Sequence, residues 1–320
     1  MKDNKIVFII GNGFDLDLGW KTQFSQFAQS SYWPTKFAVN SNLYHTLVTN
    51  RTQCRWFDIE QLMANYAAPK NGLTSSSRAS GDKVFFDQLS EALMSYLNEQ
   101  QSSEIQKDST AAKVLAAILA VHHKTKIYSF NYTDLHAIAG KLGITYDFAY
   151  EHVHGNLKNA SAIIGIPDSA DVVTNYEFLY KTFSPHYSSH DILFDLLEAD
   201  EVIFFGHSLG RIDYHYFQRF FQQQCRSDMQ RKDGKKITIF TYDNAARISI
   251  LKQLRNMNDK RTDLLYNQNE LNVFMTDGTD TEKIDAFLTT FLKRIRRSSI
   301  AAAMNVARPS VMLTTGSGVM

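Results

Sequence analysis

The sequence lacks the features that mark secreted, membrane-spanning and nucleic-acid-binding proteins. Its 320 residues include only two cysteines, Cys54 and Cys225, so a disulfide framework is not expected and a reducing compartment fits. No apolar run approaches the roughly 18 residues of a membrane span, and Ile6–Ile10 is too short for a signal peptide. The net charge of +1 gives no electrostatic case for a nucleic-acid partner. We therefore expect a cytoplasmic protein that binds neither a membrane nor a nucleic acid.

What the chain does have is an alternation of short apolar runs and helical stretches. Strands are expected at 6–10, 126–130, 152–154, 162–166, 201–205, 236–242 and 272–275, and helices at 134–142, 191–198, 213–225, 245–255 and 281–296. Strands separated by helices of this length indicate βαβ crossovers. The predicted fold class is therefore α/β, with a Rossmann-like, largely parallel sheet flanked by helices.

The stretch after the first strand follows a different pattern. Aromatic residues three or four apart predict helices within 24–66, and further helices are expected at 83–98 and 110–122. Between them, 69–82 contains Asn-Gly, four serines and another glycine, which predicts a loop. We expect residues 20–122 to be a helical insertion within a single domain of residues 1–297. Residues 298–320 are small and polar, and predict a disordered tail.

Ligands of open parallel sheets bind beyond the carboxyl ends of the strands, so the loops there are the candidate sites. Gly11, Asn12, Gly13 and Asp15 follow the first strand. Glycines let a backbone approach a ligand, and the next helix offers free N–H groups to a phosphate. The third glycine of the dinucleotide fingerprint is missing, so a tight strand-to-helix turn explains this motif equally well.

Two further loops carry polar side chains that could act on a ligand. Asn131 sits at a strand end, where its amide could bond a ribose hydroxyl or orient a water, although Asn131, Thr133 and Asp134 could all be helix caps. On an extended chain His152 and His154 face the same way. A histidine there could act as a general base, and a structural histidine is the alternative.

The sequence Gly206-His207-Ser208-Leu209-Gly210 matches the nucleophile elbow of α/β-hydrolases, because it follows a strand and precedes a helix. That fold needs a distant histidine later in the chain, and His215, only seven residues after Ser208, does not qualify. The other reading is a turn at the rim of the sheet that offers N–H groups and a hydroxyl to a ligand.

Histidine spacing raises a metal site as a further possibility. His152 with His154, and His186 with His190, have plausible ligand spacings, and Asp191 is nearby. The second pair lies in a Ser/Pro/Tyr-rich stretch without a firm helix, so its geometry is undefined. We expect no metal.

Taken together, these segments resemble the AbiH family, named for abortive infection against bacteriophage. The similar segments are 9–16, 21–27, the Trp…Glu stretch at 56–60, 129–133, 152–155, and 205–209 followed by Asp213. Trp20-Lys21 stands where the family usually has Leu-Pro before Thr22, and Phe24 stands for a tyrosine. The resemblance implies a phage-defence protein, and it leaves open a phage-derived trigger, a partner protein and an oligomer.

The order of motifs is similar, more distantly, to sirtuin-like NAD-binding domains. That resemblance implies NAD or a related nucleotide as substrate or ligand, with Asn131 and His154 catalytic at the nicotinamide ribose. The implied cofactor-binding residues are Gly11, Asn12, Gly13, Asp15, Thr22, Gly206, His207, Ser208 and Asp213. NAD hydrolysis is the implied activity, and a nucleotide sensor without turnover is the alternative. A sirtuin deacylase fits less well, since two cysteines cannot build its four-cysteine zinc module.

Overall fold

Six parallel strands form the sheet at the centre of the protein. The computed structural model describes residues 5–34, 41–53, 59–69 and 76–306. The strands are β1 (Ile6–Ile10), β2 (Thr125–Ser129), β3 (Glu151–His152), β4 (Glu201–Phe205), β5 (Lys236–Thr241) and β6 (Glu270–Met275). Their order across the sheet is β3-β2-β1-β4-β5-β6. The α/β, Rossmann-like fold class predicted from the sequence is confirmed.

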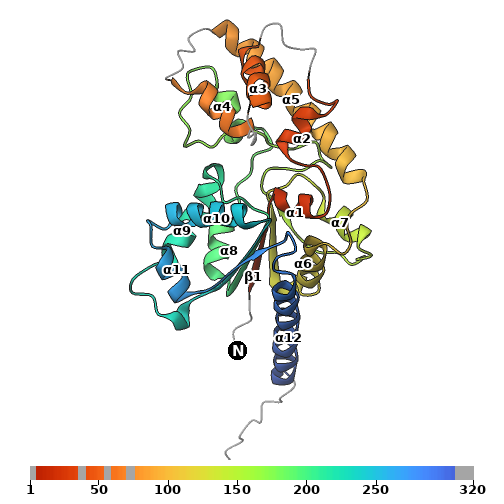
Figure 1. Ribbon diagram of the computed structural model, residues 1–320, viewed down its shortest axis with the longest axis vertical. Helices are drawn as coiled ribbons and strands as arrows, with labels where there is room; N and C mark the ends of the chain where they lie inside the picture. The colour runs from red at the N-terminus through yellow and green to blue at the C-terminus, as the bar shows by residue number, and fades with distance from the viewer. Residues whose placement is uncertain (1–4, 35–40, 54–58, 70–75, 307–320) are drawn as a thin grey trace, which may run out of the picture.

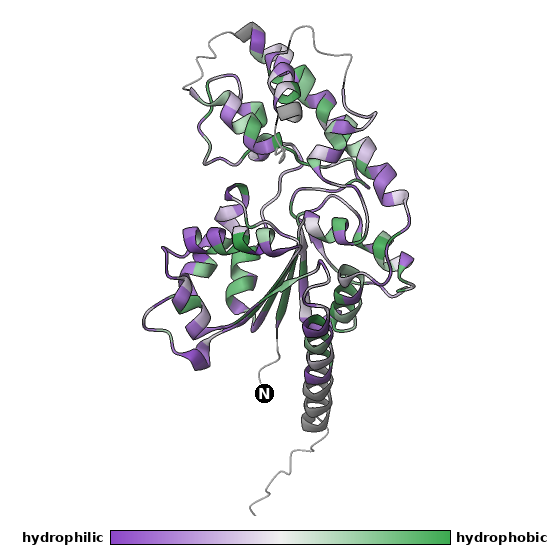
Figure 2. Cartoon of the chain, in the orientation of Figure 1, coloured by the Kyte–Doolittle hydropathy of each residue, from purple (hydrophilic) through white to green (hydrophobic). Residues whose placement is uncertain are grey.

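The central strands are buried on both faces because alternate side chains enter two separate cores. In β1, Phe8 and Ile10 enter one core, while Val7 and Ile9 enter the other. The first core is covered by α1 (Asn12–Asp17), α6 (Thr110–Leu119), α7 (Leu135–Lys141) and α12 (Thr281–Val306). The second is covered by α8 (Ile192–Glu198), α9 (Tyr214–Gln223), α10 (Asn244–Met257) and α11 (Thr262–Gln268). Figure 2 shows the hydrophobic colouring of the strands and of α8.

A second group of helices forms a helical lobe beyond the carboxyl edge of the sheet (Figure 1). It contains α2 (Phe24–Gln29), α3 (Asn42–Gln53), α4 (Ile59–Ala67) and α5 (Ser76–Ser102), and residues 157–180 complete its core. The buried Asp82 holds the lobe together, accepting hydrogen bonds from Tyr66 and Tyr176, each over 2.6 Å. Ser41 donates to the same carboxylate over 2.7 Å. No helix in the described ranges has the length and apolar character needed to cross a membrane.

Some boundaries differ from those predicted. Residues 76–82, expected to be a loop, are the first turns of α5, while residues 70–75 of that loop lie outside the described residues. The strand expected at 162–166 is wrong, since only Ile166 forms a bridge, with Tyr180. Residues 298–306 of the expected tail continue α12, and residues 307–320 lie outside the described residues. The helix α11 (Thr262–Gln268) was not predicted from the sequence.

Candidate functional site

The loops singled out in the sequence meet at one edge of the sheet. β1 pairs with β2 on one side and with β4 on the other, so the order of the strands reverses at β1. In open α/β sheets this switch point, at the carboxyl ends of the strands, is where ligands bind. The helical lobe lies beyond the same edge (Figure 1), so the site is built between the sheet and the lobe.

The turns after β1 and β4 pack directly against each other. The Gly13 N–H donates to the Gly206 carbonyl over 2.9 Å, and the Gly11 N–H donates to the Phe205 carbonyl over 3.0 Å. Gly206 has a φ of +65°, and a Cβ built there would lie 2.3 Å from the backbone nitrogen of Phe14. These glycines are therefore required by the contact between the two turns. Their predicted place beside a cofactor stays a prediction.

Asp15 is buried beneath the first turn and ties it to the loop after β2. Its carboxylate accepts a hydrogen bond from Thr133 Oγ1 over 2.9 Å, and the Asn131 side chain bonds to it as well. Asn131 Nδ2 also donates to the Gly11 carbonyl over 3.1 Å. Burial raises the pKa of Asp15 to about 7, although both hydrogen bonds oppose the shift. Asn131 thus holds the two loops together, and its catalytic role stays a prediction.

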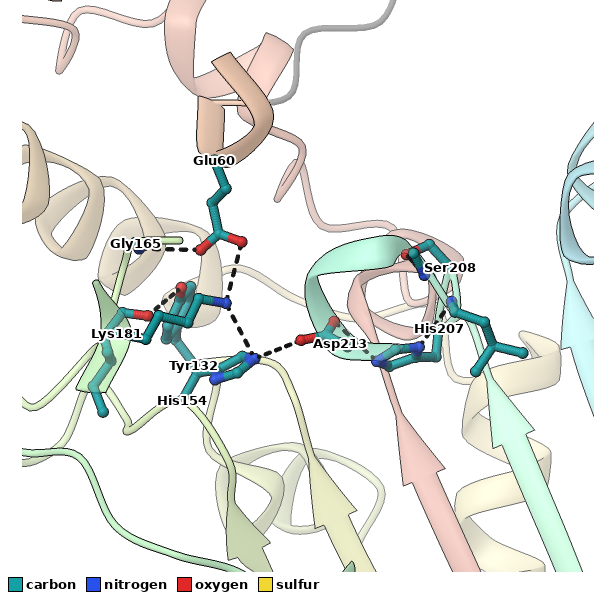
Figure 3. Close-up of polar contacts among 11 residues, drawn as sticks. Glu60, Tyr132, His154, Gly165, Lys181, His207, Ser208 and Asp213 are labelled. Carbon is teal, nitrogen blue, oxygen red and sulfur yellow. Dashed lines mark hydrogen bonds and ion pairs between the residues drawn. The ribbon is translucent and has the colours of Figure 1, made fainter. Parts of the chain in front are cut away.

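His154 and two residues predicted as cofactor-binding form one buried group. His154 Nε2 lies 3.2 Å from Asp213 Oδ1, at the end of the short helix η5 (Arg211–Asp213). His207 Nε2 lies 3.5 Å from the other oxygen, Asp213 Oδ2. The Leu209 N–H donates to His207 Nδ1 over 3.0 Å, which holds that ring in place. Figure 3 shows Asp213 between the two imidazoles.

Lys181 and Glu60 extend this group into the helical lobe. Lys181 Nζ lies 3.3 Å from His154 Nε2 and 3.2 Å from Glu60 Oε2. Glu60 projects from α4, and its Oε1 accepts the Gly165 N–H over 3.2 Å (Figure 3). The side chains of Lys181 and Glu60 are only 8% and 11% exposed, so this is a buried ion pair. Glu60 of the helical lobe is therefore linked to His154 through Lys181.

Lys181 was not predicted as a site residue from the sequence, and no role was predicted for Glu60. Lys181 begins a single turn of helix, Lys181–Phe183, in a region without a periodic pattern. Glu60 ends the Trp…Glu stretch, whose residues 56–58 lie outside the described residues. That stretch was the only sequence signal for either residue. An ion pair between segments 121 residues apart leaves no local trace in a sequence.

The electrostatics of the group favour a neutral histidine beside an ionised carboxylate. Burial and the charge of Lys181 lower the pKa of His154 to about 4, although Asp213 opposes the shift. Burial alone would raise the pKa of Asp213, but the His154 hydrogen bond and the Lys181 charge outweigh it and hold the pKa below its ordinary value. Burial also lowers the pKa of His207. His154 is therefore uncharged at neutral pH and able to accept a proton.

The two neighbours of His154 Nε2 make opposite demands on that atom. An ammonium group can only donate a hydrogen bond, and a carboxylate can only accept one. When Nε2 carries the proton it donates to Asp213, and the Nδ1 lone pair is then the basic one. No residue in the described part of the chain bonds Nδ1. In that tautomer a carboxylate holds the protonated nitrogen of a neutral imidazole, which is the arrangement of a general base.

Other predicted site residues lie outside this group. Thr22 Oγ1 donates to Asn12 Oδ1 over 2.6 Å, which braces the start of α1. Ser208 is exposed, and its Oγ accepts the Gly210 N–H over 3.3 Å. Among the described residues no histidine bonds Ser208, so the serine–histidine pair of a hydrolase is missing there. The nucleophile-elbow reading therefore has no structural support.

His152 does not join His154. Its Nδ1 bonds the Asn131 carbonyl oxygen over 3.0 Å, and its Nε2 bonds Tyr150 Oη over 3.1 Å. Within the described ranges, no group of three or more His, Cys, Asp or Glu side chains is arranged to hold a metal. His152 is therefore a structural residue that supports the loop of Asn131.

Comparison with known families and structures assigns the chain that carries this site to a family. A family model described as "Bacteriophage abortive infection AbiH" matches residues 7–231, which include every residue of the buried group. No curated protein matches the chain. A solved structure described as "Structural Basis for the Mechanism and Regulation of Sir2 Enzymes" is 11% identical, with a TM-score of 0.37, and covers 92% of this chain and 94% of that chain. That likeness is too weak to bear on function. The family match covers most of the chain, and the protein belongs to the AbiH family.

Proposed function

We propose that this AbiH-family protein acts in phage defence by hydrolysing NAD or a related nucleotide at the carboxyl edge of its sheet. The observation that carries the proposal is the neutral, buried His154 oriented by Asp213. Perturbed titratable groups at a switch point are typical of catalytic sites. The family description supports the defence role. The motif order similar to sirtuin-like domains supports NAD as the nucleotide.

In the proposed reaction, water attacks C1′ of the nicotinamide ribose while the C1′–N bond breaks. The bonding electrons pass to the nicotinamide nitrogen, which loses its positive charge, and the water proton passes to His154 Nδ1. Positive charge builds on the ribose in the transition state, and the ionised Asp213 favours it electrostatically. Once His154 releases its proton to solvent, the products are ADP-ribose, nicotinamide and a proton.

In this scheme Asn131 orients the substrate. Its Nδ2 is engaged with Gly11 and its side chain with Asp15, so the amide is held rigidly. A fixed amide oxygen can accept a hydrogen bond from a ribose hydroxyl or from the attacking water. Rigid placement of such a group costs little entropy at the moment of reaction.

The test is the release of nicotinamide and ADP-ribose from NAD by the purified protein. His154→Asn should lower kcat by about 10²–10⁴-fold, the usual contribution of a general base. The matched control is His136→Gln, an exposed histidine of α7, which should keep wild-type activity. If the wild type leaves NAD intact, alone and with phage lysate added, hydrolysis is wrong.

A nucleotide sensor without turnover is the second candidate. Asn131 and Asp15 are hydrogen-bonded to other residues of the protein, so their side chains have a structural role. This observation favours a site that binds a nucleotide without acting on it. A sensor would bind NAD in calorimetry and give no product over the same incubation. Binding with turnover would eliminate it.

A further inference from the structure

A pocket of about 830 Å³ has residues of η5 and α9 in its lining. Its walls come from the η5–α9 segment, the end of α10 and the loop at Ser169. Arg211 and His215 line it, and each lies two residues from Asp213 in the sequence. The segment that presents Asp213 to His154 on one side thus forms a wall of this pocket. A volume of this size suits a small organic ligand.

The pocket is lined by three side-chain cations and a single carboxylate. The cations are Arg211, Arg255 and Lys260, and the acid is Asp259. Arg261 lies 3.3 Å from Asp259, so that carboxylate already has a counter-ion. Among the described residues, the charged groups of Arg211 and Lys260 have no ion-pair partner, and Arg255 bonds only the Lys260 carbonyl oxygen. The lining therefore carries uncompensated positive charge.

We propose that this pocket binds the phosphate groups of a small diphosphate-bearing ligand. Guanidinium groups match phosphate oxygens in pairs, and two arginines from different helices can hold two adjacent phosphates. The Gly13 N–H at the switch point is already bonded to Gly206, so the first turn does not offer it to an anion. The inference rests on the proposed function only in taking the diphosphate to be that of the nucleotide cleaved at His154.

A small ligand is favoured over a nucleic acid by the charge of the whole chain. A protein that follows a phosphate backbone needs an extended basic surface. Here the net charge is +1, and Arg211, Arg255 and Lys260 line a single pocket. The ligand chemistry is therefore that of a diphosphate, free or within a nucleotide.

The test is calorimetry with inorganic pyrophosphate on the full chain. Arg255→Gln and Arg211→Gln should each weaken binding at least about 10-fold, as expected for loss of a charge-assisted pair. The matched controls are Lys252→Gln on α10 and Arg219→Gln on α9, exposed cations outside the pocket, and both variants should bind like the wild type. Circular dichroism of each variant separates lost binding from lost folding.

Three results would overturn the assignment. These are no binding of pyrophosphate to the wild type, equal weakening by the controls, and tighter binding of a single-stranded oligonucleotide that depends on the control residues. NAD turnover distinguishes this proposal from the previous one. Pyrophosphate binding without NAD cleavage would contradict NAD hydrolysis and leave the pocket assignment standing. NAD cleavage with an unchanged KM in Arg255→Gln would show that the pocket does not hold the diphosphate of the cleaved nucleotide, and would leave hydrolysis standing.

Discussion

His154 is the residue on which the proposed chemistry depends, because a general base must be unprotonated. Burial and Lys181 lower its pKa to about 4, from an ordinary value of 6.5. We therefore expect the acidic limb of kcat/KM for NAD to have its midpoint near pH 4. Initial rates measured from neutral pH downward give this midpoint directly. A midpoint near 6.5 would show that the base is a solvated histidine elsewhere.

The lowered pKa of His154 also predicts that the protein loses stability in acid. Between pH 6.5 and about 4 the unfolded chain protonates His154 while the folded chain does not, so the free energy of unfolding falls as the pH falls through this window. The size is about 3 kcal/mol. Asp15, with its pKa raised to about 7, acts in the opposite direction, since its contribution is lost as the pH rises from 3.8 to about 7. Because the two contributions oppose each other, the pH dependence of the free energy of unfolding of the wild type alone would show neither.

Comparison with His154→Asn isolates the histidine. The variant keeps the Asp15 contribution and lacks that of His154. The difference in unfolding free energy between wild type and variant should therefore shrink by about 3 kcal/mol from neutral pH to pH 4, measured by urea denaturation at each pH. A difference that stays constant with pH would mean that the pKa of His154 is not lowered.

Some residues of the site could be predicted from the sequence and others could not. His154, Asp213 and His207 could be found because each lies in or beside a short motif after a predicted strand. Their mutual contacts could not, since η5 brings Asp213 back over the loop of His154. Lys181 carried no signal, because its partner Glu60 belongs to a different lobe.

At the scale of elements, the two turns at the switch point depend on glycine. A Cβ at Gly206 would meet the backbone of the β1 turn, and its φ of +65° is unfavourable for other residues. Gly206→Ala should lower the free energy of unfolding by at least about 2 kcal/mol. Urea denaturation with an unchanged m-value would measure this loss.

The matched control is Gly140→Ala, on the exposed face of α7. A Cβ built there has no atom within 4 Å, and alanine favours helix. This variant should be as stable as the wild type or more stable, by up to about 1 kcal/mol. Equal losses in both variants would contradict the assigned contact between the turns.

The ion pair between α4 and the site predicts how the helical lobe acts on the base. Lys181 lowers the pKa of His154, so removing its charge should raise that pKa toward 6.5. The change is Lys181→Met together with Glu60→Gln, which removes both charges of the ion pair, so neither partner is left without the other. The acidic limb of kcat/KM should move to higher pH. An unmoved limb, in a folded variant, would show that Lys181 does not set the basicity of His154.

Elements that form central strands were the most predictable. The bounds of β1 and β4 match those expected, because strands buried on both faces read as continuous apolar runs. The first turns of α5 were missed because Ser- and Gly-rich sequence favours a loop locally. There Asp82 is bonded by Ser41, Tyr66 and Tyr176 from other segments, and these tertiary contacts decide the conformation.

At the scale of the whole molecule, the sheet and the helical lobe both contribute residues to one site. The sheet supplies His154, His207 and Asp213, while the helical lobe supplies Glu60 and, through residues 157–180, packs the chain that leads to Lys181. The sequence predicted a helical insertion after the first strand. It did not predict that the insertion reaches the base, because that contact depends on how the lobe sits over the sheet.

The measurement that tests NAD hydrolysis in defence most directly is the NAD level in phage-infected cells. Cells would carry the wild type, His154→Asn or the control His136→Gln at equal expression. We predict that NAD collapses and phage growth is restricted with the wild type and the control, and that His154→Asn abolishes both effects. Restriction of phage growth by the wild type with an intact NAD pool would contradict NAD hydrolysis as the defence activity.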